Sequence, residues 1–554
     1  MTKIRLLFFV FLLFFVGILV KLFYLQVLNQ DNFTTDYLTT RKISPERGRI
    51  FDRNEQPLAI NQTTYAMFAE PKKISNRTKV IEDLEQILHL GTSTLEARLN
   101  ATKDWVRVAR NLDKDTRDKI DGLKINAVGF DNEQIRYYPE ASLSAQLLGF
   151  VGKDDKGDNT GYFGIEGFYD QELTGLPGIM RSERDLVGRP IFVGTQEKVD
   201  PENGRDLYLT IDKAVQNIVK KKLVKAMDTY QAKQGCVIIA DPMTMQILSL
   251  VCLPDFDPTK YYEFSNDTFK NPAISDLYEP GSTFKPLIMA AGIEEKAIKP
   301  DEQMNEEGPI EESGYQIRTW NNQYAGRISM TNILEKSSNV GMVYIGKKLG
   351  KDNVYDYVKM YGFGENTDID LQGEASGYIR PKKEWYPIDF STVTFGQGIA
   401  VTPIQMITAF STVINGGLLM KPYTVFKISD GIDMRERDPK VVRRVISKKT
   451  SDILKKMLVS TVEHGEFKWA KPKGYIMGGK TGTAQVAVQG KYDASKTIAS
   501  FIGFAPVEKP RFIGLVILKE PGSSQWGSET AAPLFFDIAK ELLVYYNIPP
   551  DKPE

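Results

Sequence analysis

A serine and a lysine near the middle of the 554-residue chain have the spacing of a nucleophile and its base. Ser282 and Lys285 lie three positions apart, directly after Pro280-Gly281, which interrupts the preceding segment. A helix that begins here would put the hydroxyl and the amine on one face, beside backbone N–H groups without partners in the first turn. This pattern favours nucleophilic catalysis by a serine that a lysine activates.

Two further polar segments follow in otherwise apolar surroundings. Lys336-Ser337-Ser338-Asn339 separates two helix-like stretches, and Gly479-Lys480-Thr481-Gly482-Thr483 opens a strand-like one. We expect Ser337 to pass a proton to a leaving amine. We expect Asn339 to bind a substrate amide and to hold Lys285, and the serine between the two to point away as a spacer.

The third segment has the residue types that bind a carboxylate. Lys480 would be a second cation that lowers the pKa of Lys285. Thr481 and Thr483 offer hydroxyls to a terminal carboxylate, and Gly482 lets a substrate backbone approach closely. The backbone N–H groups of the nucleophile and of Thr483 would stabilise an oxyanion. We therefore expect this segment on an edge strand that faces the cleft.

The composition of the chain excludes several kinds of active site and partner. The only histidines, His89 and His464, fall in helix-like segments far from the three motifs. We therefore expect no Ser-His-Asp triad, no metal site and no cofactor, so that a lysine must serve as the base. The chain has 71 basic and 71 acidic residues, and this balance argues against a nucleic-acid partner.

The two cysteines cannot form a disulfide framework. Cys236 and Cys252 lie in two apolar runs joined by the turn-like Asp241-Pro242-Met243-Thr244, which indicates neighbouring strands. We expect them to be small buried apolar residues, and one cross-strand disulfide is the alternative.

The N-terminus has the pattern of a membrane anchor. An apolar run from Leu6 to Val20 continues to Leu25 if Lys21 extends toward the lipid headgroups, which gives the length needed to span a bilayer. The alternative is a cleaved signal peptide, but no small-x-small cleavage site follows. Lys3 and Arg5 place the N-terminus in the cytoplasm and the rest of the chain outside the cell membrane.

Hydrophobic periodicity predicts an α+β catalytic region after residue 205. We expect strands at 207–211, 235–240 and 246–252, and a helix from the cap Asp212 to about Tyr230. Helices dominate residues 282–414, with Thr402-Pro403 as a clear helix start. Strands return at 474–488, 498–504 and 511–518, and a helix covers 531–546. This order indicates one mixed sheet flanked by helices.

The region before residue 206 is less regular. Arg47-Gly48-Arg49-Ile50-Phe51-Asp52-Arg53-Asn54 is typical of a strand that enters a tight turn, and its charges alone favour a hairpin held by local ion pairs. Short amphipathic helices from Lys79 to about Asp121 indicate a small helical insert. We divide the chain into a cytoplasmic stub and anchor (1–25), an N-terminal domain (26–205) and a catalytic domain (206–554).

The three segments, in this order, resemble the S-x-x-K, S-x-N and K-T-G signature of penicillin-binding proteins and serine β-lactamases. Over nearly its whole length the chain resembles a class B penicillin-binding protein, specifically the septal, division-type branch. The supporting segments are 47–53, Gly164-Ile165-Glu166-Gly167, 278–286, 337–339, Thr394-Phe395-Gly396-Gln397-Gly398, Val401-Thr402-Pro403, 479–485 and 500–506. Glu279, before Pro280, resembles the septal rather than the elongation branch.

The resemblance implies a peptidoglycan D,D-transpeptidase with the penicillin-binding transpeptidase fold. Ser282 would attack the D-Ala–D-Ala amide of a stem peptide, and a side-chain amine of a neighbouring stem would then form the cross-link. β-Lactams would acylate Ser282. Residues 26–205 would be the non-catalytic pedestal of the family, of the dimerisation type, which contacts a membrane glycan polymerase and other divisome proteins.

Other readings use the same residues. A D,D-carboxypeptidase or a β-lactamase-like hydrolase would share the three motifs and differ in whether a water cleaves the acyl-enzyme. A non-enzymatic sensor would need a cytoplasmic output segment, and an elongation-type transpeptidase would share the whole architecture. One departure from the family is visible: Gly465-Glu466-Phe467 stands where relatives carry a small Gly-Thr-Ala-like stretch. We expect it to affect the local loop and contacts with partners, but not the chemistry.

Overall fold

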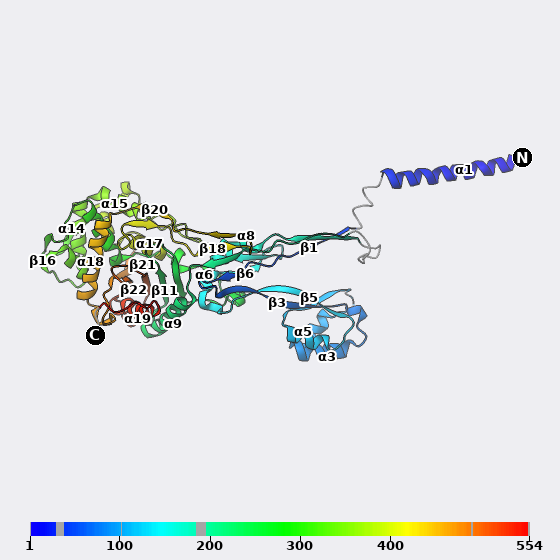
Figure 1. Cartoon of the computed structure of the whole chain (residues 1–554), viewed down its shortest axis with the longest axis horizontal. Coiled ribbons are helices and arrows are strands. Elements are labelled where there is room, and N and C mark those ends of the chain that lie inside the picture. Colours follow the sequence, from blue (N-terminus) through cyan, green and yellow to red (C-terminus); the bar gives the residue numbers. More distant parts are fainter. Residues whose placement is uncertain are drawn as a thin grey trace. The chain divides into compact units, whose positions relative to one another are not determined.

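A computed structural model describes residues 2–28, 38–100, 102, 104–183, 196–488 and 491–551. The chain forms two compact units. The first contains residues 1–48 and 174–205, and the second contains residues 49–173 and 206–554. The second carries every residue of the three motifs (Figure 1).

The first unit contains the apolar helix and a small sheet. Helix α1 (Thr2–Phe23) continues into a π-helical turn at Tyr24–Leu28. Among the described residues, the segment Lys3–Val27 is the one helix whose length and mean hydropathy of 2.9 suit a membrane span. Strands β1 (Leu38–Ile43), β8 (Gly178–Glu183) and β9 (Gln196–Val199) pair antiparallel in the order β1-β8-β9.

In the second unit, a seven-stranded sheet combines distant parts of the sequence. Its order is β19-β18-β10-β2-β3-β4, and β5 also pairs with β3. The strands are β2 (Ile50–Phe51), β3 (Pro57–Ala69), β4 (Val106–Leu112), β5 (Val128–Tyr137), β10 (Asp206–Leu209), β18 (Val425–Ser429) and β19 (Met434–Glu436). The sheet therefore crosses the boundary that we drew at residue 206.

The predicted strand and tight turn at residues 47–54 are confirmed, although their stabilisation is not only local. Strand β2 ends at Phe51, and the buried Asp52 carboxylate accepts hydrogen bonds at 2.8 Å from the backbone N–H groups of Asn54 and Gln56. It also accepts one at 3.0 Å from the N–H of Lys213, the first residue of helix α9 (Lys213–Tyr230). Asp52 thus joins the turn to a helix start, where a carboxylate is favourable.

The predicted helical insert is present, but it also contains a strand. Helices α3 (Arg77–Leu88), α4 (Thr92–Arg98) and α5 (Lys114–Asp121) surround β4, and their apolar side chains share one core with β3. Farther along, the predicted Gly-Ile-Glu-Gly segment begins α7 (Gly164–Phe168). Its Glu166 is fully buried and pairs with Arg136 of β5 at 2.6 Å, which ties the short helix to the sheet.

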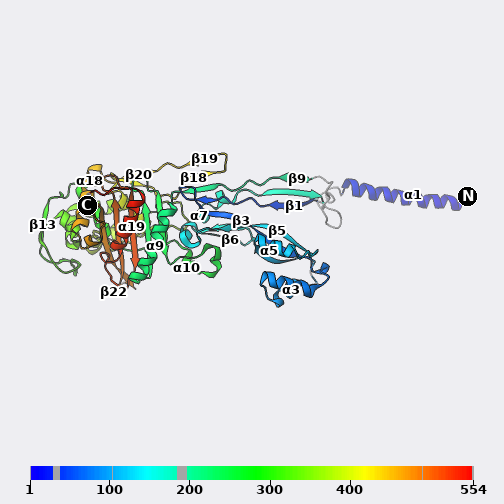
Figure 2. The same ribbon diagram turned by 60° about the horizontal axis from the view of Figure 1, so that its bottom comes forward.

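The catalytic region is built on a five-stranded sheet in the order β12-β11-β23-β22-β21 (Figure 2). The strands are β11 (Gln234–Ala240), β12 (Ile247–Leu253), β21 (Gly478–Val488), β22 (Lys491–Ala505) and β23 (Phe512–Lys519). The α+β class is confirmed, but the expected mixed sheet is wrong because each of these strand pairs is antiparallel. Alternation of apolar residues predicts strands without fixing their direction, which depends on the connections.

Helices cover both faces of this sheet. Helices α9 (Lys213–Tyr230) and α19 (Ala531–Tyr545) pack on the face to which Val237 and Ile239 of β11 point. Ile238 and Ala240 point to the opposite face, into the core that contains the buried helices α12 (Lys285–Glu294) and α17 (Pro403–Ser411). The two-residue period of the strand therefore divides its apolar side chains between two cores.

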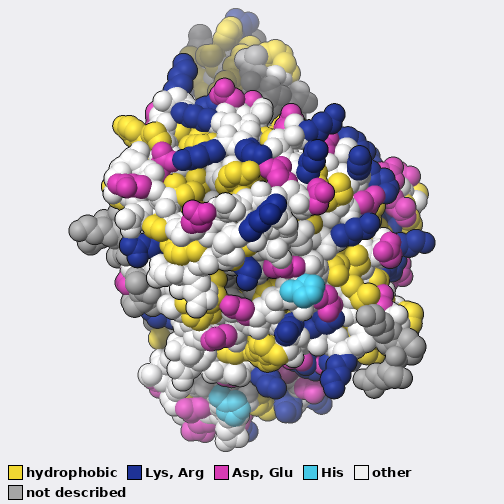
Figure 3. Space-filling view, turned by 90° about the vertical axis from the view of Figure 1, so that its left-hand side faces the viewer, with side chains coloured by type: hydrophobic (Ala, Val, Ile, Leu, Met, Phe, Trp, Pro, Cys, Tyr) yellow, Lys and Arg dark blue, Asp and Glu magenta, His cyan; other side chains and the backbone are white. Residues whose placement is uncertain are grey.

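Most helices lie between β12 and β21 in the sequence, as predicted. They are α10 (Asn266–Phe269), α11 (Pro272–Ser275), α12 (Lys285–Glu294), α13 (Met330–Glu335), α14 (Asn339–Leu349), α15 (Lys351–Met360), α16 (Pro387–Val393), α17 (Pro403–Ser411) and α18 (Lys448–His464). Short two-stranded sheets connect them: β13 (Gln303–Glu306) with β16 (Gly326–Ser329), β14 (Ile310–Glu312) with β15 (Tyr315–Ile317), and β17 (Leu418–Met420) with β20 (Val441–Arg444). On the face drawn in Figure 3, acidic and basic side chains are interspersed.

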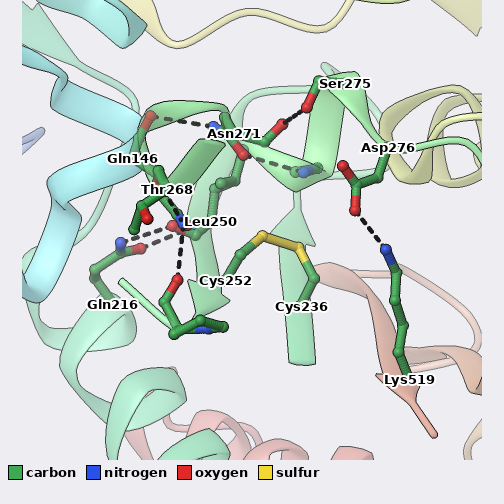
Figure 4. The surroundings of a disulfide bond; sticks show 12 residues. Gln146, Gln216, Cys236, Leu250, Cys252, Thr268, Asn271, Ser275, Asp276 and Lys519 are labelled. Carbon is green, nitrogen blue, oxygen red and sulfur yellow. Dashed lines mark hydrogen bonds and ion pairs between the residues drawn. A yellow bond between two sulfur atoms is a disulfide. The ribbon is translucent and has the colours of Figure 1, made fainter. Parts of the chain in front are cut away.

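The two cysteines form a disulfide between neighbouring strands. Cys236 of β11 pairs with Cys252 of β12 in the antiparallel ladder, and their sulfur atoms are bonded (Figure 4). Our expectation of free buried thiols was therefore wrong, and the alternative was right. Both residues are buried, and an ion pair between Lys519 and Asp276 lies nearby.

Candidate active site

Ser282 lies in a tight turn that leads into a buried helix. Residues Gly281–Phe284 form a 3-10 turn, and α12 begins at Lys285. The predicted helix start is thus confirmed, with the serine one turn ahead of the regular helix. Gly281 has a φ of +55°, which favours glycine, and its N–H donates to the carbonyl of Gly396 at 2.9 Å. Phe284 is fully buried and packs on Phe363, so the turn has an apolar anchor.

The lysine of the first motif meets the second motif directly. Lys285 is fully buried, and its Nζ donates to the backbone carbonyl of Ser337 at 2.6 Å and to the Ser337 hydroxyl at 3.1 Å. It also donates to Oδ1 of Asn339 at 2.8 Å. The predicted contact between Lys285 and Asn339 is therefore present, and three oxygen acceptors fix the position of the amine.

The connection between α13 and α14 presents these acceptors. Ser337 has a φ of +54°, which is uncommon for a residue with a side chain. Ser338 points away from Lys285, but it is more than a spacer: its Oγ accepts from the N–H of Gly341 at 2.8 Å and caps α14. The same hydroxyl donates to the buried carboxylate of Glu306 on β13.

The third motif lies on β21, the edge strand of the five-stranded sheet, as predicted. Lys480 is buried, and its Nζ donates to the carbonyl of Thr481 at 3.1 Å and to the Thr481 hydroxyl at 3.3 Å. Thr483 Oγ1 accepts from the N–H of Gly527 at 3.1 Å. A Cβ on Gly482 would lie 2.5 Å from Ser500 Oγ, so internal packing alone favours glycine here. The close approach of a substrate backbone at this position stays a prediction.

One cleft brings the three motifs together. Its volume is about 140 Å³. The lining includes these predicted residues: Ser282, Ser337, Asn339, Thr481, Gly482 and Thr483. Lys285 and Lys480 are buried beside it. Within the described part of the chain the Ser282 hydroxyl has no hydrogen-bond partner, which leaves it available to a ligand.

Burial and charge set the protonation of the two lysines. Burial lowers the pKa of Lys285 well below its usual range, the charge of Lys480 lowers it further, and Glu306 acts in the opposite direction. Burial also lowers the pKa of Lys480, to about 7, against the opposing effect of Glu466. The expected influence of Lys480 on Lys285 is present, although desolvation is the larger cause for both groups.

Sequence reasoning missed several residues of the cleft. Trp320 and Trp526 both line it and contact each other with ring centroids 5.1 Å apart. His464 is distant from the motifs in sequence, but its Nδ1 lies 3.3 Å from Oε1 of Glu335, which lines the cleft. These contacts join separate loops and helices, so no local pattern could have signalled them. Glu466 was noted as a departure, and it too lines the cleft.

The fold and the site together define a class of protein: an α+β domain in which a serine precedes a buried lysine by one turn at the edge of an antiparallel sheet. Residues 235–540 match the model of the penicillin binding protein transpeptidase domain, and residues 42–209 match that of the penicillin-binding protein dimerisation domain. The chain belongs to the penicillin-binding proteins, and its two domains are those of class B.

Curated relatives span most of the chain. Stage V sporulation protein D of Bacillus subtilis is 33% identical over 517 residues, which cover 92% of this chain and 79% of that protein. Peptidoglycan D,D-transpeptidase FtsI of Escherichia coli K12 is 29% identical over 542 residues, 95% of this chain and 89% of that protein. Together with α1, such relatives indicate a single-pass membrane protein.

Solved structures of penicillin-binding proteins have the same fold as this chain. Penicillin Binding Protein 2X from Streptococcus thermophilus superposes with a TM-score of 0.78 at 22% identity, over 91% of this chain and 80% of that one. Penicillin binding protein 3 from Mycobacterium tuberculosis, complexed with aztreonam, gives a TM-score of 0.72 at 25% identity, over 92% of this chain and 98% of that one.

Proposed function

We propose that this protein is a septal-type peptidoglycan D,D-transpeptidase that cross-links stem peptides through an acyl-enzyme on Ser282. The observation that carries the proposal is the Lys285 amine, buried one turn after Ser282 and held by Ser337 and Asn339. Burial and Lys480 both lower its pKa, so the neutral amine, which can accept a proton, is more accessible than in an ordinary lysine. The relatives named peptidoglycan D,D-transpeptidase support the substrate class.

In the first half-reaction, Lys285 takes the proton of Ser282 Oγ, which attacks the carbonyl carbon of the penultimate D-alanine. The backbone N–H groups of Ser282 and Thr483 would stabilise the oxyanion. The C–N bond then breaks, the proton taken up by Lys285 passes through the Ser337 hydroxyl to the departing amine, and D-alanine leaves. An acyl ester remains on Ser282. A β-lactam would follow the same path, but its leaving group stays attached.

In the second half-reaction, the amine of a neighbouring stem peptide attacks the ester carbon. A C–N bond forms, the C–Oγ bond breaks, and the attacking amine loses one proton, which Lys285 passes to Ser282 Oγ. The product is the cross-link, and no metal or cofactor enters these steps.

The third motif would bind the terminal carboxylate of the donor peptide or of a β-lactam. Thr483 Oγ1 already accepts a hydrogen bond from Gly527, so its own hydrogen remains available to donate to a carboxylate. Lys480 adds positive charge, and Thr481 fixes the ammonium through two contacts. Thr483 would thus donate a hydrogen bond to the carboxylate, and the positive charge of Lys480 would attract it.

We propose residues 1–25 as the cytoplasmic stub and anchor, 26–205 as the pedestal and 206–554 as the transpeptidase domain. Lys3 and Arg5 would keep the N-terminus in the cytoplasm and the catalytic domain outside the cell membrane. The pedestal would contact a membrane glycan polymerase and divisome proteins. A second candidate is cross-linking during sporulation, which the 33% identity to stage V sporulation protein D favours.

Covalent labelling by a fluorescent penicillin tests the nucleophile. Ser282→Ala should abolish labelling and leave the thermal transition nearly unchanged, and Ser523→Ala, an exposed serine outside the motifs, should label like the wild type. Lys285→Arg keeps the charge but cannot serve as a base, so its acylation should fall by several orders of magnitude. Persistent labelling of Ser282→Ala would refute the assignment.

Mass spectrometry with a stem-peptide donor separates a transpeptidase from a hydrolase. After acylation, an added acceptor amine should yield the cross-linked product in preference to the hydrolysed acid. If water alone resolves the acyl-enzyme at every acceptor concentration, the protein is a carboxypeptidase or a β-lactamase-like hydrolase.

A further inference from the structure

The segment that departs from the family pattern is anchored at the cleft. After α18, residues 465–467 form a turn in which Phe467 is buried and packs against Phe501 and Phe536, with ring centroids 5.4 and 6.3 Å apart. Phe501 lies on β22, opposite Thr481 of β21 in the ladder. The phenylalanine therefore fixes the turn against the strand that neighbours the third motif.

The preceding residue, Glu466, presents a carboxylate to the cleft. It is exposed, and it lines the same cavity as Ser282 and Thr483. Among the described residues it has no hydrogen-bond or ion-pair partner. Its negative charge does act on Lys480, which is buried and donates to Thr481.

The other charged residues that line the cleft differ from Glu466. Glu335 accepts hydrogen bonds from Ser460 and, at 2.7 Å, from Asn332, and it lies 3.3 Å from His464. Its carboxylate is therefore already satisfied. Lys336 is exposed and carries the opposite charge. Glu466 is thus the cleft carboxylate whose charge is available to a ligand.

A free carboxylate here favours one of the two peptides over the other. The donor brings an anionic terminus, which Glu466 repels, whereas the acceptor arrives with an ammonium, which Glu466 attracts. D-alanine leaves before the acceptor enters, so the charge that the cleft must accommodate changes sign between the two half-reactions.

We propose that Glu466 is a specificity-determining residue that binds the ammonium of the acceptor peptide while Ser282 is acylated. This inference rests on the proposed function. Glu466 binds and concentrates the acceptor. The ammonium then releases one proton to water, and the resulting amine attacks the ester as described above. The carboxylate itself takes no part in bond formation.

Competition between two nucleophiles tests the proposal. The acyl-enzyme is formed from a thioester analogue of the stem peptide and offered Nα-acetyl-lysine methylamide, whose side chain is an ammonium at neutral pH, together with hydroxylamine, which is uncharged. The readout is the ratio of amide to hydroxamate. Glu466→Gln should lower this ratio about fivefold, as expected for loss of one partly screened ion pair. A change in the rate of acyl-enzyme formation cancels in the ratio. A loss of charge on Lys480 would repel the ammonium less and raise the ratio, which is opposite to the expected change.

Three controls make the result specific. Glu466→Asp keeps the charge and should retain most of the preference for the lysine acceptor. Glu508→Gln removes an exposed carboxylate outside the cleft and should leave the ratio unchanged. High salt should lower the wild-type ratio toward that of Glu466→Gln. An equal ratio in the wild type and Glu466→Gln would overturn the inference and leave the proposed function intact. A wild type that forms no acyl-enzyme would overturn the proposed function, and the inference with it.

Discussion

Asn339 contacts Lys285, the proposed base. Replacing Asn339 by aspartate should place a negative charge there and keep Lys285 protonated. The two side chains have the same shape, and Oδ1 of Asn339 lies 2.8 Å from Lys285 Nζ. A full negative charge at that distance interacts with an ammonium by about 6 kcal/mol at an effective dielectric constant of about 20. The substitution therefore stabilises the protonated form of Lys285, which cannot accept the serine proton.

The expected result is a displaced pH profile. The second-order rate constant for acylation by a fluorescent penicillin should rise with pH as Lys285 loses its proton. Even if solvent and relaxation remove three quarters of the interaction, the remainder of about 1.5 kcal/mol moves this rise by about one pH unit to higher pH. At neutral pH the Asn339→Asp variant should thus be slower than the wild type by about tenfold or more.

Asn339→Ala is the matched control because it removes the same contact without adding charge. The Lys285 ammonium is less stable when it loses a hydrogen-bond acceptor. In Asn339→Ala the rise of the acylation rate with pH should therefore stay in place or move to lower pH. Asn339 also donates to the carbonyl of Arg318 at 3.0 Å, a bond that both variants lose, so thermal unfolding should accompany the kinetics. If both variants slow acylation equally with no displacement of the profile, Lys285 does not titrate in this step and the reasoning fails.

Three further predictions follow from the cap, the carboxylate site and the second lysine. Ser338→Ala removes the cap of α14 and leaves the Glu306 carboxylate without its hydroxyl donor, so the free energy of unfolding should fall by about 1–2 kcal/mol in denaturant titration; an unchanged midpoint would contradict the role of the hydroxyl. Thr483→Ala removes a hydrogen bond to a charged group, worth about 1.5–3 kcal/mol, so acylation by a penicillin free acid should slow by about ten- to a hundredfold and acylation by its ester much less; equal losses would show that Thr483 does not bind the carboxylate. The pKa of Lys480 is about 7, so its charge is present below that pH and is lost above it. The rate of acylation by the free acid, divided by that of the ester measured in parallel, should therefore decline as the pH rises through about 7, because both rates share the titration of Lys285.

Local signals predicted much of the catalytic domain. Asp212 accepts hydrogen bonds from the N–H groups of Ala214 and Val215 at the start of α9, and Thr402 begins α17 with a capping box, as their sequences indicated. The order of the three motifs also predicted one shared cleft. These features depend on residues close in sequence, for which a cap or an alternation is a sufficient physical cause.

Contacts between distant segments could not be predicted in this way. Glu306 on β13 accepts a hydrogen bond from Ser338 at the start of α14, 32 residues later, and nothing around Glu306 in the sequence indicates that partner. Trp320 and Trp526 likewise contact each other although about 200 residues separate them in the sequence. Strand β4 is different: Val106-Arg107-Val108 alternates as a strand should, but the charged helices on both sides obscured it. The direction of the strands likewise depended on connections that periodicity does not contain.

The seven-stranded sheet has a consequence for how this protein can be dissected. Strand β10, just after residue 205, lies between β18 of the catalytic region and β2 of the N-terminal region, and the Asp52 carboxylate holds the first turn of α9. The two family domains therefore meet inside one hydrogen-bonded layer and do not form separately folding modules. A fragment cut at residue 206 would expose an unpaired strand edge, which favours aggregation. A soluble catalytic preparation should instead begin before β2, so that the sheet remains whole.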